Sequence, residues 1–164
     1  ARKLEANILR ISPNDSTLES IMVDIDRHFD DEYISKEIRS MQESVEKSPN
    51  DAIDKAKSLV ESCFKFILDE YGVSYNSNDK LGQLQKKVFT RLDIDANTNE
   101  AAKADKKVKT ILNSLNQIIQ VIAEIRNKYG NSHGKSAGAV QLPPRYAGLV
   151  VSSSVAVVNF VWDT

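Results

Sequence analysis

The chain has 164 residues, of which 41% are hydrophobic, and this is enough for one folding unit with a core of several packed helices. It contains only 4 Pro and 6 Gly, and few of the short alternating runs that mark strands, so its composition favours an all-α fold. Its single cysteine, Cys63, excludes an internal disulfide, and the amino-terminal residues lack the pattern of a secretory signal peptide, so we expect a cytoplasmic protein.

The two halves of the chain carry opposite charges. Residues 1–82 hold 11 Lys and Arg against 17 Asp and Glu, whereas residues 83–164 hold 11 against 6. A basic half indicates either a surface that faces a polyanion or self-association through opposite patches. A solvated helix face explains the same charges without any partner.

The beginning of the chain has no sustained hydrophobic period. Residues 1–14 end in a Ser-Pro-Asn turn, so we expect a lead-in segment followed by one domain over residues 15–164. Ala1 is either a cut end of a larger protein or a processed start, and the sequence does not separate the two.

Two helices are expected before residue 48. A capping box at Ser16–Glu19 opens the first, and apolar residues then recur at helical spacing as far as Phe29. The same period runs over residues 34–45, after a break near Asp30. We interpret the second run as a separate helix rather than a bent continuation of the first.

The next helix is expected to begin at Ser48 and Pro49, because Ser is a common cap and Pro suits the first helical position. One apolar face then continues to Tyr71. Gly72 can take the left-handed conformation that ends a helix, and residues 74–79 have the composition of a polar loop.

A shorter helix over residues 81–92 and a polar turn at 95–99 come before the longest predicted helix, which is entered through several lysines. Its apolar stripe runs from Val108 to Ile122. Counting onward in the same register reaches Arg126, which places a cation on the buried side of this helix.

Gly130 is expected to end the longest helix, and residues 131–142 to form a loop before Pro143 and Pro144 open the last element. Residues 145–162 are apolar nearly throughout. Their length favours a buried helix over a strand, and it lies at or below the edge of a membrane span, so we expect no membrane. The chain is thus predicted to be a bundle of about five to seven helices.

A candidate site lies at the end of the longest helix, where residues 126–134 read Arg-Asn-Lys-Tyr-Gly-Asn-Ser-His-Gly. A cation, an amide and an imidazole are crowded there. A buried Arg126 needs a carboxylate or phosphate partner, and Glu61 and Glu124 are the candidate carboxylates. Alternatively, Arg126 merely complements the negative end of the helix dipole beside an ordinary Gly-rich turn.

An Arg, a polar residue and then a His after four to six residues resembles the signature of HEPN ribonucleases. Here six residues separate Arg126 from His133. The surroundings resemble the C-terminal domain of abortive-infection proteins, since Glu61 lies in the preceding long helix and Pro144-Arg145-Tyr146-Ala147 opens an apolar closing helix. The similarity runs from about Ile34 to the end of the chain.

The resemblance implies an HEPN-like all-α bundle and metal-independent cleavage of RNA, in which the ribose 2′-hydroxyl attacks the adjacent phosphate. His133 would transfer protons, Arg126 would hold phosphate oxygens as charge develops, and Asn127 would donate a hydrogen bond or orient the histidine. HEPN domains usually pair, which would bring two copies of His133 into one cleft. We therefore expect a homodimer and neither a metal nor a cofactor.

Other residues have supporting roles in this hypothesis. Asn131, Arg145 and Glu61 lie in the matching segments, and Tyr129 is a candidate for stacking on a base, although packing is the favoured explanation for it. Lysines would provide an electrostatic cradle for the backbone of tRNA or mRNA. The candidates are Lys86, Lys87, Lys103, Lys106, Lys107, Lys128 and Lys135.

Two other classes of protein fit the same sequence. A non-catalytic HEPN module would dimerise, or would bind RNA or an antitoxin, without cutting, and a small helical regulator would use Arg126 in an interface salt bridge. The intact Arg126, Asn127 and His133 favour the nuclease. By resemblance this is a toxin of anti-phage defence, with an antitoxin or a sensor domain as a further kind of partner.

Overall fold

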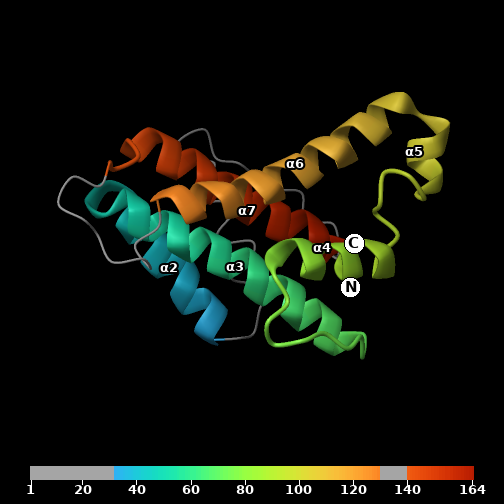
Figure 1. Ribbon diagram of the computed structural model, residues 1–164, viewed down its shortest axis with the longest axis horizontal. Coiled ribbons are helices and arrows are strands. Elements are labelled where there is room, and N and C mark those ends of the chain that lie inside the picture. Colours follow the sequence, from blue (N-terminus) through green and yellow to red (C-terminus); the bar gives the residue numbers. More distant parts are fainter. Residues whose placement is uncertain (1–31, 130–139) are drawn as a thin grey trace, which may run out of the picture.

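The computed structural model describes residues 32–129 and 140–164, which form an all-α bundle of six helices (Figure 1). The predicted helix over residues 16–29 lies outside the described residues. The six helices are α2 (Glu32–Lys47), α3 (Pro49–Glu70), α4 (Leu81–Arg91), α5 (Glu100–Ala104), α6 (Lys106–Tyr129) and α7 (Pro144–Asp163). The predicted all-α fold is confirmed.

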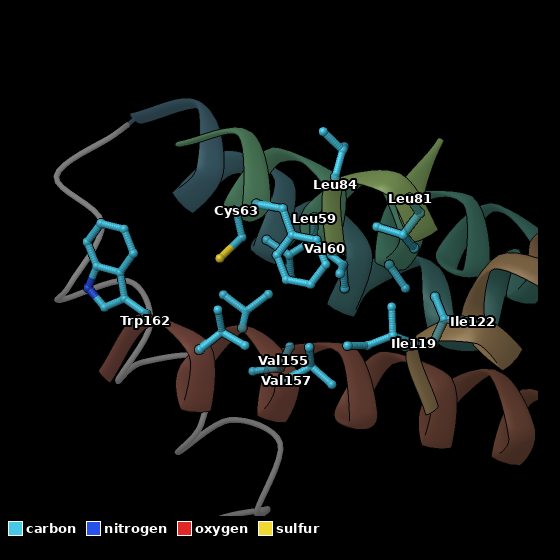
Figure 2. Packing of buried hydrophobic residues seen from close by; sticks show 14 of the residues in the cluster. Leu59, Val60, Cys63, Leu81, Leu84, Ile119, Ile122, Val155, Val157 and Trp162 are labelled. Atoms are coloured by element: carbon cyan, nitrogen blue, oxygen red, sulfur yellow. The ribbon is translucent and has the colours of Figure 1, made fainter. Parts of the chain in front are cut away.

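α3 is the central helix of the bundle, and α2, α4, α6 and α7 all pack against it. A helix that is apolar around much of its circumference has to be covered on several sides. The side chains that require this cover are Ala52, Ile53, Ala56, Leu59, Val60, Cys63, Phe64, Ile67 and Leu68, all of which are buried. Figure 2 shows several of them meeting side chains of α4, α6 and α7 in one continuous core.

The ends of α3 follow the sequence signals closely. Pro49 occupies the first turn, and Gly72, with φ of +64°, follows the last turn as predicted. This left-handed residue lets the Val73 N–H donate to the Leu68 carbonyl at 2.8 Å, which satisfies a carbonyl at the end of the helix. Ser48 stands at the predicted start, but its side chain makes no capping hydrogen bond.

The segment predicted as the longest helix is divided in the structure into α5 and α6. The prediction that one helix is entered through Lys103 is therefore wrong. Asp105 has extended backbone angles between α5 and α6, and its carboxylate accepts from the Lys107 N–H at 2.7 Å. Asp105 therefore caps α6 at the point where α5 stops. α5 and the outer half of α6 project from the bundle (Figure 1), held by a small cluster of Ala96, Ala102 and Leu112.

α7 is a core helix, with Val151, Val155, Val158 and Trp162 buried. Among the helices described, it alone is long and apolar enough by length and composition to cross a membrane, but half of its apolar window is buried inside the bundle. The Trp162 ring lies 5.5 Å from that of Phe66 on α3, and Figure 2 shows it at one end of the core. Burial in this way is what is expected of an apolar helix inside a globular domain.

Candidate active site

Three segments that are distant in sequence meet at one end of the bundle: the last turns of α6, the first turns of α3 and the residues before α7 (Figure 1). Asn50 of α3 is only 3% exposed, and its side-chain oxygen accepts from the Leu142 N–H at 3.2 Å. This bond ties the start of α7 to α3. Arg126 of α6 reaches Asp54 of α3 at the same end.

Arg126 is paired with a carboxylate, as a buried-side cation requires, but the predicted partners were wrong. Its Nε donates to Asp54 Oδ1 at 3.1 Å, and the two side chains are 23% and 20% exposed. Glu61 lies two turns further along α3, about 10 Å away along the axis. α6 crosses α3 near Asp54, and the crossing point is set by packing rather than by local sequence.

The pairing leaves much of the guanidinium group available. Asp54 contacts Nε, while one terminal nitrogen of Arg126 lies 3.5 Å from the side-chain oxygen of Asn127. An Arg side chain has five N–H donors in a planar fork, so one carboxylate oxygen does not exhaust it. Arg126 and Asn127 are therefore positioned as neighbours, with donors left for an anion.

Glu61 is held by two lysines of its own helix. Its carboxylate lies 2.6 Å from Lys57 Nζ and 3.5 Å from Lys65 Nζ. Burial alone would raise the pKa of Glu61, but the two ammonium groups outweigh it and hold the pKa below its ordinary value of 4.5. Glu61 is thus an ionised carboxylate at neutral pH, suited to orienting cations rather than to donating a proton.

Glu61 and Arg126 line the same groove, which has a volume of about 940 Å³ and lies between α3, the loop before α4, the first turn of α4 and α6. Its floor includes the buried Leu81 and Ile119. The sequence places Glu61 near the site as a candidate partner of Arg126 and through the family resemblance. The groove itself, and the role of Asp54, depend on how α3, α4 and α6 pack.

His133, Asn131 and Lys135 lie outside the described residues. Tyr129 is half-buried against the core, and the Lys128 ammonium lies 5.2 Å from the centre of its ring. Arg145 lies over the ring of its neighbour Tyr146, at 5.0 Å. These last residues belong to the end of α6 and the first turn of α7.

The predicted lysine cradle is spread over separate parts of the surface. Lys86 and Lys87 line a second hollow of about 660 Å³ along α4, where Lys87 Nζ lies 2.6 Å from Asp79. Lys103 pairs with Glu100 at 2.7 Å. Lys106 and Lys107 begin α6, about 30 Å along its axis from Arg126. Of the predicted lysines that the structure describes, only Lys128 is next to the site.

At this end of the bundle the described residues offer side chains suited to binding an anion. Within residues 32–129 and 140–164, no three His, Cys, Asp or Glu side chains are grouped so as to hold a metal ion. Cys63 is fully buried, and burial raises the pKa of its thiol, so it is not a nucleophile in the folded domain. An Arg-Asn pair beside a groove is an arrangement for binding and stabilising an anion.

The fold and this site define a small helical domain. Its buried central helix, α3, contacts through Asp54 the Arg126-Asn127 pair near the end of α6. The family model Abi_C, described as a HEPN-like domain, matches residues 32–164, and the chain therefore belongs to this family. The resemblance noted in the sequence is confirmed. No curated protein and no solved structure gave a match.

Proposed function

We propose that this domain is a metal-independent endoribonuclease of the abortive-infection type, which acts on tRNA or mRNA as a homodimer. The observation that carries the proposal is the geometry of Arg126, whose Nε is held by Asp54 while Arg126 and its neighbour Asn127 both line the groove. A guanidinium fixed through one nitrogen is preorganised to hold phosphate oxygens through the others.

The proposed reaction is an internal transfer of the phosphoryl group. The ribose 2′ oxygen forms a bond to phosphorus while the bond from phosphorus to the 5′ oxygen breaks, which leaves a 2′,3′-cyclic phosphate and a 5′-hydroxyl. In this proposal His133 takes the proton of the 2′-hydroxyl, and His133 of a second copy protonates the leaving oxygen. Arg126 and Asn127 stabilise the charge that develops on the phosphate.

An exposed apolar row on α6 supports the homodimer. Ile111, Ile118 and Val121 are 67%, 38% and 45% exposed. Their spacing places them on one side of the helix, beside the buried stripe that contains Arg126. Single exposed apolar residues are common, but an aligned row on the helix that ends in the site is what a two-fold contact between copies would use.

The test is incubation of the purified chain with total tRNA and with mRNA in EDTA, followed by mapping of the product ends. We expect cleavage that leaves cyclic phosphates, a loss of about 100-fold or more in Arg126→Ala, and no cleavage by His133→Ala. Lys103→Ala, in α5 at the projecting end of the domain, is the matched control and should cleave as the unmodified chain does. A folded dimer that cuts no RNA, with or without metal, would show that the domain is a non-catalytic module.

A further inference from the structure

Polar side chains line two walls of the groove beside Arg126. On α6 the groove is lined by Gln120, Glu124 and Asn127, and on the opposite side by Asn78 and Gln83. The three α6 residues are spaced by four and three, so they form one ridge that extends for about 10 Å and ends next to Arg126. Amides and a carboxylate therefore lead directly to the proposed catalytic group.

Several of these side chains make no hydrogen bond to other described residues. Gln83 accepts from the Lys80 N–H at 2.7 Å, and the buried Gln85 donates to Asn116, so both have structural roles. Gln120 and Glu124, in contrast, are exposed, and their side chains make no hydrogen bond within the described part of the chain. Their donors and acceptors remain available to a ligand in the groove.

The shape of the groove suits a flat ligand. Its floor is apolar, with Leu81 and Ile119 buried and the small Ala123 between the polar ridge and the core. On the α4 side, Gly82 leaves open space, because a Cβ built there would meet no atom within 4 Å. A planar ring can lie on the apolar floor with its polar edge toward the α6 ridge.

The charges of the groove argue for a base rather than for the phosphate backbone. Three cationic side chains are matched by three anionic ones, and Lys57 is already paired with Glu61. A neutral groove gains little from phosphates, whose binding depends on unpaired Lys and Arg. Amide and carboxylate groups are instead the side chains that recognise base edges.

We propose that this groove binds the nucleobase next to the cleaved phosphate and selects bases with an exocyclic amino group over uracil. This inference rests on the proposed function. A carboxylate such as that of Glu124 accepts hydrogen bonds, so it favours the amino groups of adenine, cytosine or guanine. Uracil has no amino group and offers a single N–H at its pairing edge. Gln120 provides both a donor and an acceptor to complete the recognition.

The first experiment measures binding without cleavage. Fluorescent 2′-O-methyl oligonucleotides of adenosine, cytidine or uridine cannot be cut by 2′-hydroxyl attack, so the unmodified chain can be titrated with each by anisotropy. We expect adenosine and cytidine oligomers to bind about tenfold more tightly than the uridine oligomer. Glu124→Ala and Gln120→Ala should reduce this preference while leaving the salt dependence of binding unchanged, because neither contacts phosphate.

A second pair of variants tests whether RNA enters the groove. Gly82→Trp should fill the groove and weaken binding of all three oligomers, whereas Gly82→Ala is the matched control and should bind as the unmodified chain does. Both substitutions replace glycine in a helix without a clash at Cβ, so thermal unfolding should show both proteins folded.

The outcomes of these experiments test base binding in the groove separately from the proposed nuclease activity. Equal affinity for the three oligomers, no binding at all, or equal binding by Gly82→Trp and Gly82→Ala would overturn the base groove, even if unmodified RNA is cleaved. A preference for amino-bearing bases that depends on Glu124, without cleavage of unmodified RNA, would contradict the proposed nuclease activity and support base binding in the groove.

Discussion

Asp54 and Arg126 show how one ion pair can serve both packing and chemistry. The pair is about one-fifth exposed, so its charges are partly removed from water, and each would be costly there without the other. Asp54 contacts Nε and not the two terminal nitrogens. We therefore regard Asp54 as a positioning residue, which orients the guanidinium and leaves its terminal nitrogens for phosphate.

Asp54→Asn should lower the rate of RNA cleavage more than it lowers RNA affinity. Loss of the carboxylate lets Arg126 leave its orientation, and misplacement of a catalytic group by about 1 Å can cost up to about 100-fold in rate. Single-turnover and steady-state cleavage would separate kcat from KM. Asp51→Asn is the matched control, since Asp51 pairs with Lys55 at 2.8 Å and makes no contact with Arg126. Equal effects of the two variants on kcat would show that Asp54 is only structural.

The lowered pKa of Glu61 predicts that the free energy of unfolding depends on pH. Its pKa is lowered in the folded state, so its contribution to stability is fully present at a pH above the ordinary pKa of 4.5. This contribution is lost as the pH falls through the pKa of the folded state. Glu61→Gln should reduce the free energy of unfolding at pH 7 by about 0.5 kcal/mol, because the pairs with Lys57 and Lys65 are partly solvated. The difference should vanish in urea titrations well below pH 4. A gap that persists at low pH would mean that Glu61 acts through packing and not through its charge.

At the scale of the helices, stability is distributed unevenly along α6. Its second half is covered by the bundle and buries Ile119 and Ile122, whereas its first half is held to α5 by a small separate cluster around Leu112. Regions with few buried apolar contacts open at low free energy without global unfolding. The projecting arm, residues 100–114, is thus expected to be the least stable of the described helical segments.

Hydrogen–deuterium exchange should reveal this difference. Amides in the projecting arm are expected to exchange through local opening, orders of magnitude faster than those around Phe64 in the middle of α3, which should exchange only on global unfolding. Leu112→Ala should accelerate exchange in the arm and leave α3 unaffected, with Leu59→Ala as the control that lowers protection everywhere. Uniform protection along α6 would contradict a separately stabilised arm.

At the scale of the whole molecule, α6 carries polar and apolar side chains on different parts of its exposed surface. Gln120 and Asn127 line the groove, and the exposed Ile118 lies on the other side of the buried stripe that contains Arg126. Val121 lies about one turn from Glu124, which lines the outer edge of the groove. A second copy that packs on Ile118 therefore leaves the side of α6 that carries Gln120 open, so dimerisation and binding in the groove are compatible.

Ile118→Glu should convert the proposed homodimer into a monomer and abolish RNA cleavage, because a charge at the centre of an apolar contact is costly to bury. Size-exclusion chromatography with light scattering gives the mass, and the cleavage assay gives the activity. Phe160→Glu, at an exposed apolar position of α7, is the matched control and should leave both unchanged. A monomeric Ile118→Glu protein with full activity would exclude a composite site.

The sequence alone determined the all-α fold, the ends of α3, the buried register of Arg126 and the family, because helical periodicity, proline and glycine signals and the Arg-Asn segment are local patterns. Tertiary structure decided that Asp54 and not Glu61 pairs with Arg126, that the lysines are dispersed, and that a polar groove flanks the site. The physical reason is that these features depend on where α3, α4 and α6 cross. Such crossings are set by the packing of side chains from distant segments, which no local pattern encodes.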